Sequence, residues 1–74
     1  MSFLGECNGY RISYIANAST RKIHYSVERN GCCEATATIT LDGWSFEYNR
    51  NNLSAKDATA VREFIFRHPP YRLL

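Results

Sequence analysis

Apolar and polar side chains alternate along four segments of the chain. In residues 10–16 and 44–48 the apolar side chains occupy the even-numbered positions, with Ile15 as the exception, and in residues 23–28 and 34–41 they occupy the odd-numbered ones. Successive side chains of a strand point to opposite faces, so each segment would carry one apolar and one polar face. The pattern predicts a four-stranded antiparallel sheet, a meander of hairpins, that is covered on one face only.

The connection after the third segment supports this sheet. Asp42-Gly43 is a preferred dipeptide of the two-residue type I′ hairpin turn. A turn there sets the register Leu41–Trp44, Ile39–Phe46 and Ala37–Tyr48, with two apolar side chains on the same face in every pair. Turn chemistry and face pattern therefore specify the same register.

The stretch Asn30-Gly31-Cys32-Cys33-Glu34 poses a register problem. A two-residue turn at Asn30-Gly31 would pair Val27, an inward residue, with Glu34, an outward one. Pairing Val27 with Ala35 keeps the faces matched, and it leaves residues 30–32 as a three-residue turn or bulge. We expect this second arrangement, with Cys33 facing the core and the thiols free.

The C-terminal part of the chain predicts one helix. Ser54 suits the N-cap and Asp57 the third helical position, and the Pro69-Pro70 pair would end the helix. One arc collects the apolar side chains Ala58, Val61, Phe64 and Ile65. The predicted order is ββββα, an α+β fold whose helix packs on a single face of the sheet.

Length and composition set the domain organisation. Seventy-four residues, 45% of them apolar and 22% charged, make one compact domain spanning residues 1–74. The segment 68–74, His-Pro-Pro-Tyr-Arg-Leu-Leu, forms a tail that either folds back onto the domain or docks on a partner. The net charge of +2 comes from scattered basic residues, whereas dedicated nucleic-acid binders concentrate such charge.

The sequence also bears on location. The first ten residues lack the basic segment and apolar run of a signal peptide, and no stretch approaches the ~20 apolar residues of a membrane span. Three cysteines are an odd number for a secreted disulfide framework. We expect a cytoplasmic protein that is not bound to a membrane.

No pattern of residues indicates catalysis or metal binding. The three cysteines and two histidines lack the local spacing of a zinc site. The row His24, Ser26 and Glu28 places its members roughly 7 Å apart along a strand, too far for direct hydrogen bonding, and fits a solvated face. We therefore expect neither an enzyme nor a bound metal or cofactor.

The remaining features favour a surface for another macromolecule. The short, motif-free, single-domain format resembles that of small accessory proteins of phages and other mobile elements, which implies a protein-binding inhibitor or regulator that blocks a host protein. Arginine and aromatic side chains are common anchors of such contacts. On this basis the predicted partner-binding residues are Arg21, Lys22, Arg50, Phe66, Tyr71 and Arg72.

Two alternatives stay open. Arg11 and the basic loops could contact the phosphates of a nucleic acid, although the outer face of the predicted sheet is rich in hydroxyls and offers few aromatic side chains for stacking. The open sheet face or the tail could instead mediate self-assembly. The chain would be a monomer or a homodimer.

Overall fold

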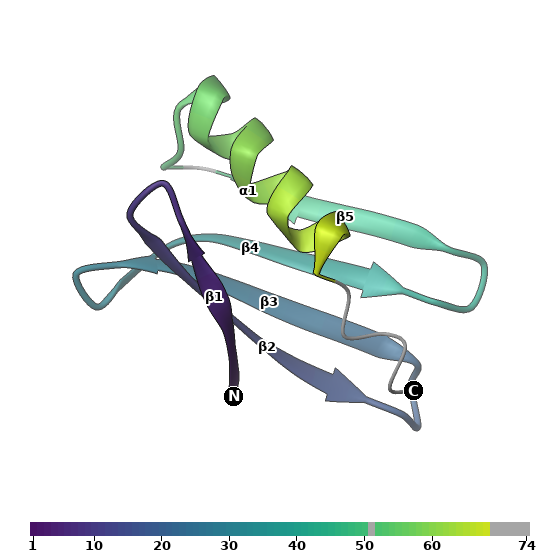
Figure 1. The fold of residues 1–74 in the computed structure, drawn as a ribbon. Coiled ribbons are helices and arrows are strands. Elements are labelled where there is room, and N and C mark those ends of the chain that lie inside the picture. Colours follow the sequence, from purple (N-terminus) through teal and green to yellow (C-terminus); the bar gives the residue numbers. More distant parts are fainter. Residues whose placement is uncertain (51, 69–74) are drawn as a thin grey trace.

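The fold is a two-layer α+β arrangement, seen in a computed structural model that describes residues 1–50 and 52–68. Five antiparallel strands pair in chain order, followed by one helix (Figure 1). The elements are β1 (Ser2–Cys7), β2 (Tyr10–Asn17), β3 (Lys22–Arg29), β4 (Cys32–Thr40), β5 (Ser45–Asn49) and α1 (Ala55–Arg67). The predicted antiparallel sheet and single C-terminal helix are confirmed, but the sheet has five strands rather than four.

The strand that the alternation pattern missed is β1. Asn8 and Gly9, at φ 51° and 82°, connect it to β2, so the turn is of the left-handed kind that Asn-Gly favours. The register of β1 shifts between Phe3 and Gly5, which interrupts the alternation of faces along the strand. The Asn8-Gly9 dipeptide was therefore the usable sequence signal for this hairpin, because the bulge removed the alternation of apolar and polar residues along β1.

The predicted β4–β5 register is confirmed for the pairs Ala37–Tyr48 and Ile39–Phe46, but Leu41 and Trp44 are not a strand pair. Ile39 lies opposite Phe46, and Thr40 lies opposite Ser45. Residues 41–44 form the connection, in which the amide of Trp44 donates to the carbonyl of Leu41 at 3.2 Å. The expectation that Trp44 belongs to the covered face is wrong, because its left-handed backbone, at φ 46°, takes it out of the strand and leaves it 52% exposed.

In the β3–β4 hairpin the bulge lies within β4 rather than in the turn, where it was predicted. Val27 pairs with Ala35 as predicted, but Asn30-Gly31 forms a two-residue turn and the extra residue is Glu34. The predicted three-residue turn is thus wrong, since an Asn-Gly turn is favourable in its own right and the bulge can form one step further along β4. The same shift puts Cys33 on the outer face, where its Sγ lies 3.7 Å from Ser26 Oγ, so an inward Cys33 is also wrong.

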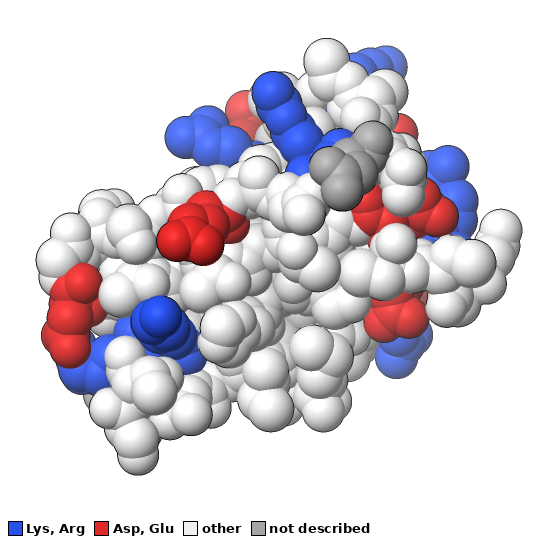
Figure 2. Space-filling view, turned by 180° about the vertical axis from the view of Figure 1, so that it is seen from behind, with Lys and Arg blue, Asp and Glu red and all other residues white. Residues whose placement is uncertain are grey.

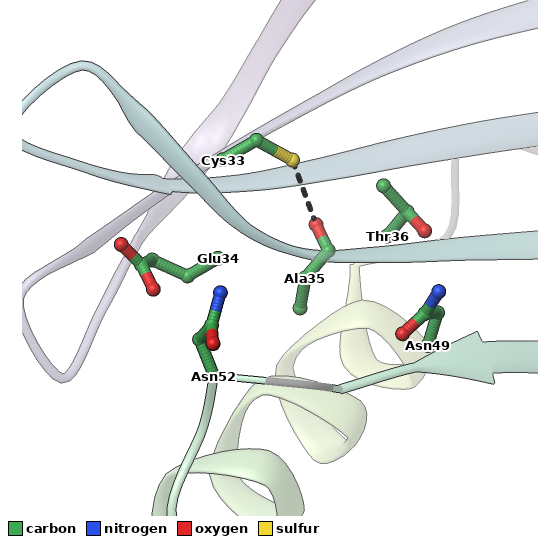
Figure 3. A pocket seen from close by; sticks show the side chains of 6 residues that line it. All are labelled: Cys33, Glu34, Ala35, Thr36, Asn49 and Asn52. Carbon is green, nitrogen blue, oxygen red and sulfur yellow. Dashed lines mark hydrogen bonds between the residues drawn. The ribbon is translucent and has the colours of Figure 1, made fainter.

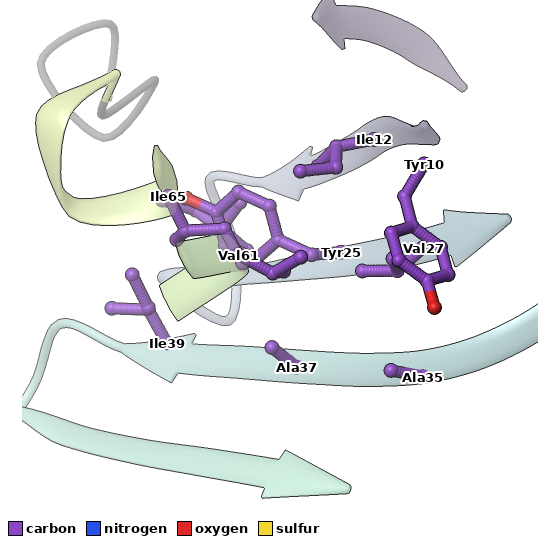
Figure 4. Close-up of a cluster of buried hydrophobic side chains, with 10 residues drawn as sticks. Tyr10, Ile12, Tyr25, Val27, Ala35, Ala37, Ile39, Val61 and Ile65 are labelled. Carbon is purple, nitrogen blue, oxygen red and sulfur yellow. The ribbon is translucent and has the colours of Figure 1, made fainter. Parts of the chain in front are cut away.

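The core lies between the inner face of the sheet and α1 (Figure 4). Ser54 caps the helix as predicted, its Oγ accepting from the Asp57 amide at 3.2 Å. The helix buries Ala58, Val61 and Ile65. The buried apolar side chains of the sheet are Tyr10, Ile12, Ile23, Tyr25, Val27, Ala35, Ala37 and Ile39. Helix and sheet each contribute one apolar surface, which neither could bury alone.

Candidate interaction surface

Two turns meet at one end of the sheet, between β2 and β3 and between β4 and β5. The carbonyl of Arg21 accepts from the Leu41 amide at 2.9 Å, and Arg21 Nε donates to Asp42 Oδ1 at the same distance. Within the first turn, Asn17 Oδ1 accepts from the amides of residues 19 and 20 at 3.0 and 3.2 Å. These bonds hold the two turns together as one surface.

We call Arg21, Lys22, Asp42 and Trp44 the turn surface. The side chains of Arg21 and Asp42 are 47% and 72% exposed, and Lys22 is exposed as well. Such an exposed ion pair contributes little to stability. Two cations and one anion leave the turn surface with a net charge of about +1. It therefore combines an aromatic side chain, an arginine and an excess of positive charge on a bonded backbone.

The structure does not bring the predicted binding residues together. Arg50 directly follows β5, at the end of that strand opposite the turn surface. Phe66 packs against Phe46, with ring centroids 4.9 Å apart, so it supports the helix rather than standing exposed. Tyr71 and Arg72 fall within residues 69–74, which lie outside the described part of the chain. Of the six, only Arg21 and Lys22 share a surface in the described part of the chain.

A second cluster lies on the outer face of the sheet, along β1 and β2. Phe3 and Ile15 are 50% and 51% exposed, and the Arg11 guanidinium lies 4.1 Å from the Phe3 ring centroid. Sequence reasoning missed this cluster because it missed β1. Figure 2 shows charged side chains separated by uncharged surface on the face turned away from the view of Figure 1.

The exposed Cys33 lines a shallow cavity of about 150 Å³ (Figure 3). Its lining consists of Cys33, Glu34, Ala35, Thr36, Asn49 and Asn52. The Cys33 thiol contacts the Ala35 carbonyl at 3.4 Å and the Ser26 hydroxyl, neither of which is a base that would activate a nucleophile. Among residues 1–50 and 52–68, no three His, Cys, Asp or Glu side chains gather where they could hold a metal.

Cys7, on the inner side of β1, is chemically different from the other two thiols. Its partial burial, with a smaller contribution from the Asp57 carboxylate, raises its pKa. A raised thiol pKa lowers the fraction of reactive thiolate at neutral pH. We therefore expect Cys7, which is also the least exposed of the three cysteines, to react slowly with thiol reagents.

Comparisons with protein-family models, curated proteins and solved structures give no match to this chain. The described residues contain no helix with the length and apolar character needed to cross a membrane.

Proposed function

We propose that the protein is a non-enzymatic binding module of the cytoplasm that inhibits or regulates a host protein by covering part of its surface. The observation that carries this proposal is the half-exposed Trp44 on a turn bonded to Arg21. Tryptophan and arginine are the side chains that most often dominate protein–protein binding energy. The turn surface is the proposed contact.

The fold supports this role because the contact is ordered before binding. Arg21 is fixed through its carbonyl and through Nε, and β3 and β5 begin immediately after the two turns. A surface that is already ordered loses less conformational entropy on association. A domain this small can therefore bind through a few anchoring side chains.

The proposal is tested by affinity capture from cells of the native source, read by mass spectrometry. Immobilised wild type should retain a protein in stoichiometric amount, and Trp44→Ala or Arg21→Ala should weaken its retention about tenfold or more, as expected for anchoring residues. Arg50→Ala is the matched control, because it removes the same charge at the other end of β5. Retention that is the same for wild type, Trp44→Ala and Arg21→Ala would show that the turn surface is not the contact.

Nucleic-acid binding is the second candidate, and one observation favours it. A half-exposed aromatic side chain on the turn that is bonded to Arg21 also suits a stacked base with its phosphate. Such binding would fall steeply with salt because counterions are released. A gel shift at low salt that disappears at moderate salt would favour this candidate, and no shift at low salt would eliminate it.

A further inference from the structure

Within residues 1–50 and 52–68, four residues other than glycine adopt left-handed backbone angles, and they fall into two pairs. Asn8 and Asn30, at φ 51° and 53°, occupy the Asn-Gly turns at one end of the sheet. Asparagine tolerates this conformation well. Arg21 and Trp44, at φ 54° and 46°, occupy the turns at the other end. Large side chains adopt this conformation at a cost, so the strain is concentrated in the turn surface.

The backbone angles of these two positions do not require a large side chain. Glycine adopts the same backbone without the steric cost and would complete either turn. Neither side chain is buried, and the Arg21–Asp42 pair is exposed. Sequences tend to break a local rule where function demands it, so strain at two exposed positions points to a role in binding.

We propose that the strained turn surface recognises an acidic segment of the partner protein that carries an apolar side chain beside its carboxylates. This inference rests on the proposed function and specifies the partner's chemistry. Arg21 Nε is held by Asp42 Oδ1 at 2.9 Å, which orients the guanidinium plane. Its terminal nitrogens have no hydrogen-bond partner among the described residues and can bind a carboxylate with two parallel bonds.

The other members of the turn surface complete the recognition. Lys22 supplies a second cation, and the net charge of about +1 favours an anionic partner. The exposed part of the Trp44 ring offers an apolar face on the turn that is bonded to Arg21. A partner segment with carboxylates alone would use only half of this surface.

The strain is tested without any partner, by comparing glycine with alanine at the same position. Both Trp44→Gly and Trp44→Ala remove the indole, so their difference reports the backbone alone. Trp44→Gly should unfold with an equilibrium constant roughly fivefold lower than that of Trp44→Ala, as measured by urea denaturation. At Ser45, in extended β5, the order should reverse, with the alanine variant the more stable. The same order at both positions would overturn the strain argument.

The partner chemistry is tested by selecting peptides from a random phage-displayed library on the immobilised full-length protein. Enriched peptides should carry Asp or Glu beside Leu, Ile or an aromatic residue. They should bind Arg21→Ala and Trp44→Ala at least tenfold more weakly, as expected for anchoring side chains, and bind Arg50→Ala like wild type. A synthetic copy of an enriched peptide should shift the emission of Trp44, the chain's single tryptophan, to shorter wavelength.

Several results would overturn this inference. They are the absence of enrichment, enriched peptides without acidic residues, and equal binding to wild type, Trp44→Ala and Arg21→Ala. Saturable quenching of Trp44 by single-stranded oligothymidylate, with no response to the acidic peptide, would assign the surface to nucleic acid instead. If cellular capture depends on Trp44 but no acidic peptide is selected, only the partner chemistry is wrong. If cellular capture does not depend on Trp44, the proposed function itself fails.

Discussion

At Gly5 the backbone of β1 lies against the Phe64 ring of α1. Replacing Gly5 with alanine should therefore destabilise the protein. A Cβ at this position would lie 2.6 Å from Phe64 Cζ and 3.4 and 3.6 Å from the two Cε atoms. The ring cannot easily move away, because it is stacked on His68 with ring centroids 4.2 Å apart. The His68 amide also donates to the Phe64 carbonyl at 3.1 Å.

The size of the effect follows from two opposing terms. Forcing an extra methyl group into a packed site costs about 1–3 kcal/mol. Alanine in place of glycine in a strand returns about 0.5–1 kcal/mol through the smaller entropy of the unfolded chain. Gly5→Ala should therefore lower the free energy of unfolding by about 1 kcal/mol, within a span of about 0–2.5 kcal/mol. For a domain of this size, each kcal/mol corresponds to a Tm shift of about 4–8 °C.

Thermal and urea denaturation of four proteins would test this reasoning: wild type, Gly5→Ala, Phe64→Leu and the double variant. Leucine has no atom at the Cζ position, so Gly5→Ala should be neutral or stabilising in the Phe64→Leu background. A stabilising Gly5→Ala in the wild-type background would refute the steric argument. An equal loss in both backgrounds would refute the assignment of the clash to Phe64.

Three further predictions follow from single contacts. Ser54→Ala removes the N-cap oxygen and should cost about 1 kcal/mol by urea denaturation. Burial raises the pKa of Tyr48, so the folded state holds the phenolic proton more tightly and the associated stability is lost as pH rises above about 10. Tyr48→Phe should therefore flatten the fall in stability above that pH, and an unchanged slope would contradict this. With a thiol reagent, the exposed Cys32 and Cys33 should react quickly and Cys7 slowly, whereas one uniform phase would contradict the different environments.

The sequence predicted those parts of the fold in which local signals agree. Alternation and turn chemistry both specified the pairing of Ile39 with Phe46. The N-cap at Ser54 was also predictable, because its residue types have one favourable arrangement at the start of a helix. For both elements, interactions between residues close in the sequence, together with the single apolar face of each element, were enough to predict the structure.

The errors arose where a bulge separates the local pattern from the register. The shift between Phe3 and Gly5 concealed β1, and the extra Glu34 moved Cys33 to the outer face. Two placements of a bulge can satisfy the same alternation, and only tertiary packing distinguishes them. The strain at Trp44 was likewise invisible, since backbone angles in a turn depend on the partner strands.

The candidate surface was only partly predictable for a similar reason. Arg21 and Lys22 were selected as basic loop residues, but their neighbours could not be known. The bonds from Arg21 to Leu41 and Asp42 join turns twenty residues apart in the sequence, and only the folded sheet places them together. Composition could suggest an anchoring arginine, whereas the tertiary fold determined that the turn bearing Trp44 is bonded to it.

The central claim, that the turn surface contacts the partner, is tested most directly by amide NMR of the isotope-labelled protein with its captured partner. The account predicts that binding broadens or shifts the amide signals of residues 17–22 and 41–45, while the Asn-Gly turns at the opposite end of the sheet stay unchanged. Changes centred on Phe3, Arg11 and Ile15, or on the cavity beside Cys33, with the signals of residues 17–22 and 41–45 unaltered, would contradict it.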